Sequence, residues 1–214
     1  MKHIDGWWCP EVLSGPGKFE RRAQVIAYAL TFWAGPRRRV IQAGAHIGIF
    51  PRQLAQYFEA VVCFEPAPDN WDCLILNTRH NPRIICYYGA LGACQGTAAV
   101  NVQPHSTGGH HIATRMDRPH VLVTVCPIDV LEYNDLDALF LDIEGYECFA
   151  LAGGMQTLER CRPLIVAEDN GCSRKYGIQL GGVEAWLAKY VGYVQVGRHG
   201  EDSIFVPEER VRCH

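Results

Sequence analysis

The segment from Val40 to Asn77, VIQAGAHIGIFPRQLAQYFEAVVCFEPAPDNWDCLILN, constrains the fold more than any other part of the chain. An apolar strand pattern is followed by a loop of small residues, a helix pattern, and a second strand that ends at Glu65. Small residues let a ligand approach the backbone, and the N–H groups at the start of the helix point at whatever binds there. A carboxylate about 20 residues further on can accept hydrogen bonds from both hydroxyls of a ribose. This order predicts half of a mononucleotide-binding site and a nucleotide-cofactor enzyme.

The glycine spacing of this loop restricts the class of cofactor that the loop is expected to bind. Gly44 and Gly48 are spaced G-x-x-x-G, which does not match the G-x-G-x-x-G fingerprint of dinucleotide-binding proteins. A nicotinamide-dependent oxidoreductase is therefore the less favoured alternative.

The rest of the chain alternates between strand and helix patterns. A helix is expected at about 19–33, after an irregular lead-in, and strands are expected at 39–43, 60–65, 83–90, 136–143 and 163–169, with helices between most neighbours. The segments YVQVG and DSIFV predict a final antiparallel hairpin. The series predicts an α/β fold with a doubly wound, mostly parallel sheet. We expect one domain over 36–214, preceded by a lead-in and helix over 1–35, with a hairpin-like insertion at about 93–125.

Composition restricts the partners and the setting. The net charge of −3 gives no basic field, so tight binding to nucleic acid is not expected. The ten cysteines include no C-x-x-C pair, which argues against zinc-ribbon and thioredoxin-like sites. MKHIDGWW lacks the apolar core of a signal peptide, and no apolar run approaches a membrane span. We therefore expect a cytoplasmic protein without membrane contact.

Short motifs then follow in a fixed order. They are Gly44-Ala45 and Gly48, Phe64-Glu65-Pro66-Ala67-Pro68-Asp69-Asn70, Asn77, Ala90-Leu91-Gly92, Ile128-Asp129-Val130-Leu131, Asp142-Ile143-Glu144-Gly145-Tyr146-Glu147, Gly153 and Glu168. Over about residues 39–170 the sequence resembles the FkbM-type branch of methyltransferases. The resemblance implies a Rossmann-like class I methyltransferase fold and S-adenosyl-L-methionine (S-adenosylmethionine) as the cofactor. We expect O-methylation of a hydroxyl on a sugar, glycoconjugate or small-molecule metabolite, with the oligomeric state left open.

Two residues depart from the pattern of that family. Gln42 stands where the family carries an acid, and it brings no charge to meet the sulfonium or amino group of the cofactor. A catalytically inactive methyltransferase-like binding module therefore stays open as an alternative. His46 stands where the family carries asparagine, and it either replaces that residue through a ring nitrogen or caps the start of the helix.

The strand order that the resemblance implies places the first and fourth strands side by side. Asp142 and Glu144 should then face the loop 44–48 across the site. The expected cofactor-binding residues are Gln42, Gly44, Ala45, His46, Gly48, Glu65, Pro66, Asn70, Ala90, Leu91 and Asp142.

A proton must leave the acceptor hydroxyl during methylation, so a base is expected in the site. The candidate catalytic residues are Asp142, Glu144, His110 and His111. Alternatively, Glu144 and Glu147 are acids that favour a helix N-terminus, and the two histidines are polar surface.

Glu168-Asp169-Asn170 is expected to end the fifth strand. With Asp142 it would offer the oxygen ligands that magnesium prefers. The favoured interpretation is a site without metal, in which Glu168 supports the loop that starts at Asp142.

Overall fold

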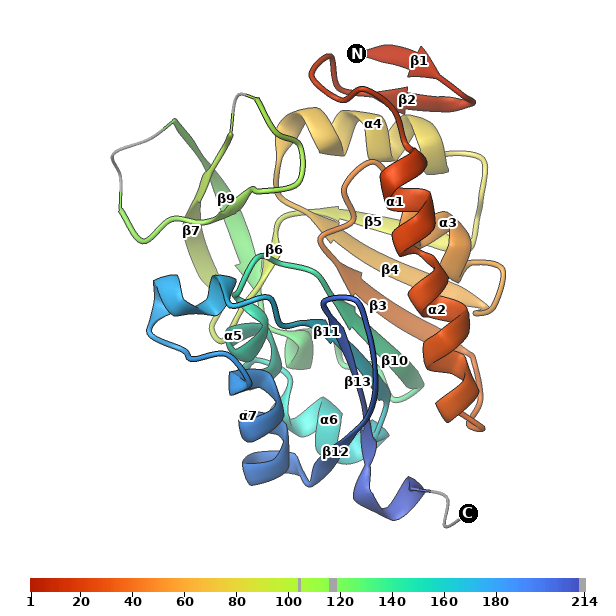
Figure 1. Cartoon of the computed structure of the whole chain (residues 1–214), viewed down its shortest axis with the longest axis vertical. Coiled ribbons are helices and arrows are strands. Elements are labelled where there is room, and N and C mark those ends of the chain that lie inside the picture. Colours follow the sequence, from red (N-terminus) through yellow and green to blue (C-terminus); the bar gives the residue numbers. More distant parts are fainter. Residues whose placement is uncertain (104, 116–118, 212–214) are drawn as a thin grey trace.

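The computed structural model describes residues 1–103, 105–115 and 119–211 of the chain. A seven-stranded sheet with the order β12-β13-β11-β10-β3-β4-β5 forms its centre (Figure 1). The parallel strands are β3 (Arg39–Ala43), β4 (Ala60–Glu65), β5 (Ile84–Tyr88), β10 (Leu136–Leu141) and β11 (Leu164–Glu168). The hairpin of β12 (Tyr193–His199) and β13 (Asp202–Pro207) adds to β11 in antiparallel direction. The expected mostly parallel sheet with a terminal antiparallel hairpin is confirmed.

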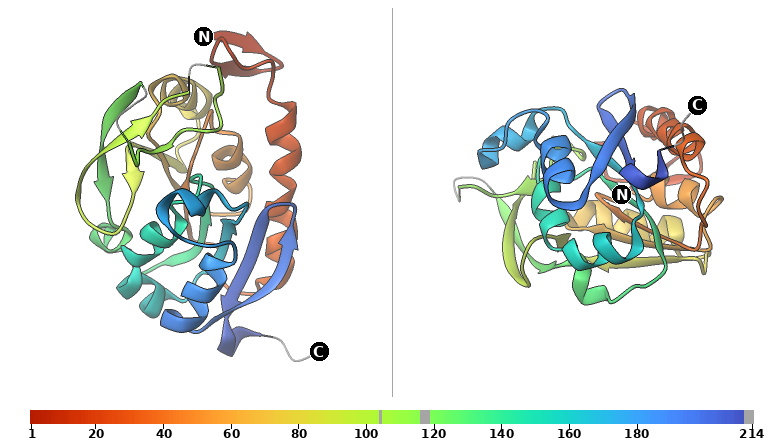
Figure 2. Two further views of the ribbon diagram at one scale, coloured as in Figure 1. Left: turned by 60° about the vertical axis from the view of Figure 1, so that its left-hand side comes forward. Right: turned by 90° about the horizontal axis from the view of Figure 1, so that it is seen from below.

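Helices cover both faces of this sheet (Figure 2). One face carries α1 (Gly17–Arg22), α2 (Gln24–Ala29) with the 3₁₀ turn η1 (Leu30–Phe32), and α3 (Ile49–Leu54). The other face carries α5 (Glu147–Ala152), α6 (Met155–Cys161) and α7 (Gly182–Val191). Because side chains alternate along a strand, Val40 packs on the first face and Ile41 on the second. The apolar strands seen in the sequence are therefore buried on both sides.

Two expected helices are interrupted. The predicted helix over 19–33 is divided among α1, α2 and η1. The helix expected between the strands at 136–143 and 163–169 is divided into α5 and α6 at Gly153-Gly154. A Cβ on Gly153 would lie 2.0 Å from the carbonyl oxygen of Gly92, so the two backbones touch where the helix breaks.

A second, smaller sheet adjoins the first. It contains β6 (Ala90–Leu91), β7 (Gly96–Asn101), β8 (His111–Ile112) and β9 (His120–Cys126) in the order β6-β9-β7-β8. β7 and β9 are antiparallel, as expected for a hairpin, but β6 pairs with β9 in parallel and β8 extends the other edge. The segment between β7 and β8 reaches the cavity described below.

The remaining elements are short, apart from α4. They are β1 (Lys2–Ile4), β2 (Trp7–Cys9), α4 (Pro68–Thr78), η2 (Ile128–Leu131), η3 (Cys172–Tyr176) and η4 (Glu208–Arg210). β1 and β2 form a hairpin where an irregular lead-in was expected. The hairpin is fastened to α4 because the Asn77 side chain exchanges hydrogen bonds with the backbone of Trp8. Within the described ranges, no helix combines the length and apolar character needed to cross a membrane.

Candidate functional site

A cavity of about 900 Å³, including its open mouth, lies at the carboxyl ends of β3, β4 and β10. The chain runs outward from β3 to β4 and β5, then returns to the other side of β3 with β10, and ligands bind at such a switch point. We call it the cofactor cavity. Twelve of the expected site residues line it: Gly44, Ala45, His46, Glu65, Pro66, Asn70, Ala90, Leu91, His110, His111, Asp142 and Glu144.

The loop after β3 forms one wall and depends on Gly44. Its φ is +83°, and a Cβ there would lie 1.8 Å from the backbone oxygen of Asp142. The N–H groups of Gly44 and Ala45 donate to the carbonyl of Phe64 at 3.1 and 3.0 Å. The loop is therefore held by backbone contacts to the residues at the ends of both neighbouring strands.

Glu65 is buried at the end of β4 and organises the second wall. Its carboxylate accepts hydrogen bonds from the N–H of His46 at 2.7 Å, the N–H of Ala67 at 3.0 Å and the Asn70 amide at 3.3 Å. Burial raises the pKa of Glu65 to about 7, although these three donors act in the opposite direction. The Asn70 amide also donates to the carbonyl of Thr107 at 2.9 Å, which ties the β7–β8 segment to the cavity.

Two expected cofactor residues do not line the cavity. Gln42 is buried, and its Nε2 donates to the carbonyl of Gly44 at 2.9 Å. Gly48 faces α4 instead, because a Cβ there would lie 3.1 Å from side-chain atoms of Leu74 and Thr78. Both residues therefore support the conformation of the loop on the side that does not line the cavity.

His46 has a positive φ of 51°, a conformation in which Asn, Asp and His are enriched. Its ring packs on Phe19 with centroids 4.3 Å apart, and burial lowers the pKa of His46 to about 3. Neither ring nitrogen has a hydrogen-bond partner within the described part of the chain. The N-cap of α3 is Gly48, and no side chain caps it, so the capping role expected as one alternative is not seen. The ring nitrogens remain available to a ligand.

The loop after β10 carries Asp142 and Glu144. Glu144 and Gly145 have φ values of +56° and +98°, and Glu147 holds this sharp turn by accepting hydrogen bonds from the N–H groups of Ile143 and Gly145. The structure thus places Glu147 in a supporting position. Burial, followed by repulsion from Asp142, raises the pKa of Glu144.

The environment of Glu147 predicts a pH effect on stability. Burial raises its pKa from 4.5 to about 7 in the folded protein. Between these values the folded state binds more protons than the unfolded state, so the contribution of Glu147 is full below pH 4.5 and is lost as the pH rises to 7. Glu147→Gln keeps an acceptor and cannot ionise.

We therefore expect the unfolding free energy of the native protein, relative to Glu147→Gln, to fall by up to about 3 kcal/mol between about pH 5 and pH 7.5. Urea denaturation of both proteins at both pH values measures it. A difference that does not change with pH would contradict the burial of this carboxyl group.

His110 and His111 differ in their surroundings. The Nδ1 atom of His110 accepts a hydrogen bond from the N–H of Gln103 at 3.1 Å, and burial lowers the pKa of this histidine. The Nδ1 atom of His111 lies 2.9 Å from the carbonyl of Gly109. Because Nδ1 already accepts, the neutral His110 ring carries its proton on Nε2 and has no lone pair left to act as the base expected from the sequence.

Arg22 is a site residue that the sequence did not reveal. From the end of α1 its Nη2 atom lies 2.8 Å from Oε1 of Glu168 and 3.3 Å from Oδ2 of Asp142. Phe19, on the same helix, also lines the cofactor cavity. No local motif marks either residue, since an arginine and a phenylalanine in an amphipathic helix are ordinary.

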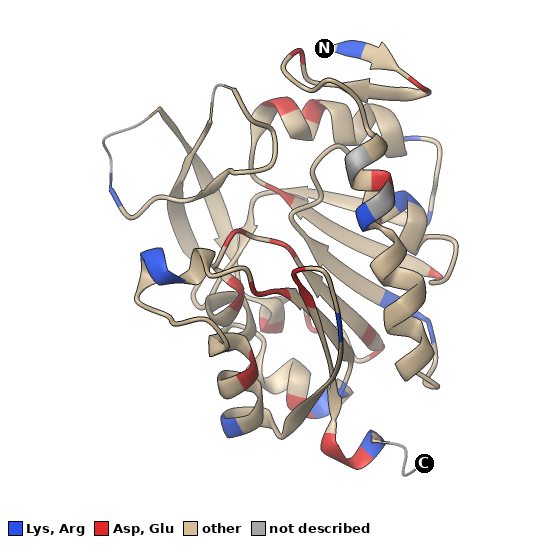
Figure 3. Ribbon diagram, in the orientation of Figure 1, with Lys and Arg blue, Asp and Glu red and all other residues tan. Residues whose placement is uncertain are grey.

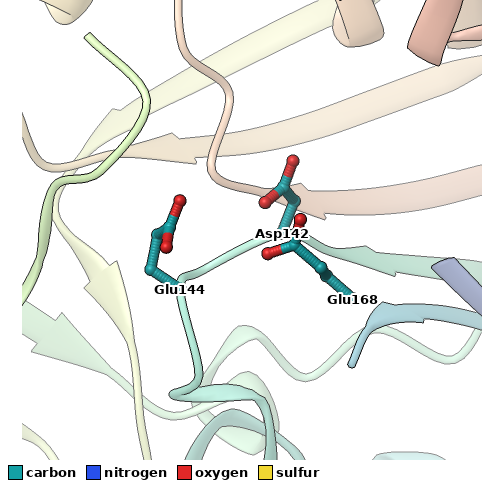
Figure 4. A group of neighbouring side chains, drawn as sticks. All are labelled: Asp142, Glu144 and Glu168. Atoms are coloured by element: carbon teal, nitrogen blue, oxygen red, sulfur yellow. The ribbon is translucent and has the colours of Figure 1, made fainter. Parts of the chain in front are cut away.

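Acidic residues gather in the loops after β10 and β11 (Figure 3). Asp142, Glu144 and Glu168 each bring one carboxyl oxygen within 4.8 Å of the others (Figure 4). Burial and repulsion from Asp142 raise the pKa of Glu168 to about 9, with Arg22 opposing. We call these residues the three-carboxyl cluster.

The oxygen-rich group expected from the sequence is only partly assembled. Asp142 and Glu168 meet, but the Asp169 carboxylate instead accepts the N–H of Gly181 at 2.7 Å. Oδ1 of Asn170 accepts the N–H of Cys172 at 2.9 Å. Glu144 takes the third position.

Comparisons with known proteins identify the fold. The FkbM methyltransferase of Methylobacillus flagellatus KT superposes with a TM-score of 0.57 at 19% identity, over 79% of this chain and 43% of that one. A precorrin 8w decarboxylase of Methanobacterium thermoautotrophicum gives 0.56 at 12% identity, over 96% and 99%. A precorrin-6y C5,15-methyltransferase of Geobacter metallireducens GS-15 gives 0.51 at 11% identity, over 96% of each chain. These likenesses show a Rossmann-like class I methyltransferase fold.

The chain spans less than half the length of the Methylobacillus protein. No curated protein sequence matches it. The model of the methyltransferase FkbM domain matches residues 42–194, which contain both wall-forming loops and the second sheet. The chain therefore belongs to the FkbM methyltransferase family.

Proposed function

We propose that the chain is an S-adenosylmethionine-dependent methyltransferase that acts on a hydroxyl group of a sugar, glycoconjugate or other small metabolite. The observation that carries the proposal is the position of Glu65 at the end of β4, facing the same cavity as Gly44, His46 and Asp142. A mononucleotide-type ligand needs this arrangement of a close backbone, a carboxylate for the ribose and an adjoining reaction site.

The residues present fit that cofactor. Three protein donors hold the Glu65 carboxylate in place and use three of its roughly four lone-pair sites, which leaves about one site to accept a hydrogen bond from the ribose. The unpartnered ring nitrogens of His46 supply further polar contacts, and Phe64 and Leu91 offer apolar surface to an adenine ring. S-adenosylmethionine, when bound, supplies a methyl group on a sulfonium, whose departure leaves a neutral thioether.

The chain itself must orient the acceptor and remove its proton. Glu144 is the favoured base, because it lines the cavity and burial raises its pKa towards the working range of a general base. The proton of the acceptor hydroxyl would pass to a carboxylate oxygen of Glu144. Phe19 and Arg22, from the N-terminal helix, line the same cavity and would contact the bound acceptor or cofactor.

Calorimetric titration with S-adenosylmethionine tests cofactor binding, and release of S-adenosylhomocysteine with a panel of sugars and hydroxylated metabolites tests turnover. Binding without turnover on any acceptor would favour an inactive module, for which Gln42 is the motivating residue. Failure to bind S-adenosylmethionine, together with a fluorescence response to a reduced nicotinamide, would favour the oxidoreductase alternative.

Glu65→Ala tests the proposed ribose contact. We expect S-adenosylmethionine binding to weaken by about 2–4 kcal/mol, because ligand hydroxyls lose a charged acceptor. Three buried protein donors lose theirs as well, so the unfolding free energy should fall by about 1–3 kcal/mol. Calorimetry well below the melting temperature, beside urea denaturation, separates the two effects. The exposed Glu59→Ala is the control, and unchanged cofactor affinity in Glu65→Ala would remove Glu65 from the site.

A further inference from the structure

The three-carboxyl cluster has the geometry of a cation site. Its oxygens lie within 4.8 Å of one another. Any three points so spaced share a centre no more than about 2.8 Å from each, and oxygen ligands lie roughly 2.0–2.1 Å from Mg²⁺ and roughly 2.3–2.6 Å from Ca²⁺. Side-chain adjustments of at most roughly 0.5 Å would reach the Ca²⁺ distance, and of at most roughly 0.8 Å the Mg²⁺ distance. Figure 4 shows the carboxyl groups turned towards a common space at the ends of β10 and β11.

Glu168 gives a second and independent indication of a ligand. Its side chain is only 3% exposed. Oε1 accepts from Arg22, but the buried Oε2 has no hydrogen-bond partner among the residues that the structure describes. A buried carboxyl oxygen without a partner is costly, and a ligand bound at Oε2 would remove that cost.

Charged side chains surround the cluster. Arg22 contacts Asp142 and Glu168. Burial, followed by repulsion among the carboxyl groups, raises the pKa of Glu144 and of Glu168, and a divalent cation at the centre would reduce that repulsion. The buried carboxyl of Asp202 is close enough to repel Asp142, and Lys175 attracts Glu144.

A second cavity gives access to the three-carboxyl cluster. This cavity, of about 930 Å³ including its open mouth, is lined among others by Ser14, Phe19, Arg22, Glu144, Glu168 and Asn170. Arg22 and Glu144 line the cofactor cavity too. The cluster therefore stands where the two cavities meet, and the second cavity supplies space for water or an acceptor oxygen beside it.

We propose that Asp142, Glu144 and Glu168 bind a hard divalent cation, and that the Arg22 guanidinium occupies this position when the cation is absent. Oxygen-only ligands select Mg²⁺ or Ca²⁺ over softer metals. A cation held there lowers the pKa of a coordinated acceptor hydroxyl and so assists its deprotonation. The inference concerns the acceptor side of the proposed methyltransferase site, but cation binding requires neither cofactor nor acceptor.

The cation and the Arg22 guanidinium would compete for the same carboxyl oxygens of the cluster. If Arg22 fills the position about nine-tenths of the time, the apparent dissociation constant of the cation is raised about tenfold. Removing the guanidinium should lower the apparent dissociation constant of the cation by the same factor.

Calorimetric titration of the metal-stripped protein with Mg²⁺, and separately with Ca²⁺, tests the proposal without S-adenosylmethionine. We expect saturable binding at one site in the native protein. Glu168→Gln should weaken it at least about tenfold, as expected when a metal site loses a supporting group. Arg22→Met should tighten it about tenfold. Glu201→Gln is the matched control, because Glu201 lines the second cavity outside the cluster and its loss should leave the affinity unchanged.

A second measurement guards against misfolded variants. Saturating cation should raise the melting temperature of the native protein and of Glu201→Gln, but not that of Glu168→Gln. Absence of saturable binding in the native protein overturns the proposal, as does equal binding in Glu168→Gln. Equal affinity in the native protein and a folded Arg22→Met overturns the competition. Either failure leaves cofactor binding by Glu65 untouched, so it is distinguishable from failure of the proposed function.

Discussion

Glu144→Gln should lower turnover on the methyl acceptor by roughly 10²–10⁴, the usual size of general-base catalysis, while S-adenosylmethionine binding survives. Glutamine keeps the shape and hydrogen-bonding capacity of the side chain, including an oxygen for the Cys172 thiol, which donates to Glu144 at 3.4 Å. Only basicity and charge are lost. The measurement is the rate of S-adenosylhomocysteine release with an acceptor found by screening the native enzyme, beside cofactor calorimetry.

Two controls test whether the loss of turnover comes from removal of the base. The exposed Glu159→Gln on α6 should retain full turnover. If Glu144 acts by holding a cation rather than as the base, high Mg²⁺ or Ca²⁺ should partly restore the rate of Glu144→Gln, whereas a missing base is not restored. Full turnover of Glu144→Gln at neutral pH would exclude Glu144 from catalysis and leave His111 as the candidate.

Gly44→Ala should destabilise the protein by at least about 3 kcal/mol and abolish measurable cofactor binding. A Cβ at Gly44 would lie 1.8 Å from the Asp142 carbonyl oxygen, which is impossible without movement of the loop or of the end of β10. Such movement would also disturb the N–H groups that bond to Phe64. Urea denaturation and calorimetry with S-adenosylmethionine measure the two effects.

Gly177→Ala separates the close contact from the backbone conformation. Gly177 has a φ of +81°, nearly that of Gly44, but a Cβ there would meet nothing within 4 Å. Its substitution should cost only about 1–2 kcal/mol, the price of a left-handed conformation, and leave the affinity for the cofactor unchanged. Similar losses in both variants would mean that the approach of Gly44 to Asp142 does not shape the site.

The sequence by itself determined the strands of the central sheet and the two loops that carry Glu65 and Asp142. These features are local: apolar runs mark the buried strands, and the polar residues that end them lie at one edge because parallel strands point the same way. The motifs around Glu65 and Asp142 then implied which strands are neighbours, and the pairing of β3 with both β4 and β10 agrees.

Tertiary structure alone decided which way individual side chains point. Gln42 and Gly48 belong to the recognised loop, yet one folds back on the Gly44 carbonyl and the other packs against α4. Asp169 follows Glu168 directly, but neighbouring side chains along a strand point to opposite sides. Glu168 therefore reaches the cluster, and Asp169 bonds to Gly181.

Arg22 is the clearest example of a site residue whose position depends on the tertiary structure. It joins Glu168 across 146 positions of sequence, and its place depends on how α1 packs over the finished sheet. Local pattern determines a strand, a loop or a helix, because it reflects backbone preference and burial of one face. The contact of one guanidinium with the carboxyl groups of Asp142 and Glu168 reflects long-range packing, and no spacing within the chain encodes it.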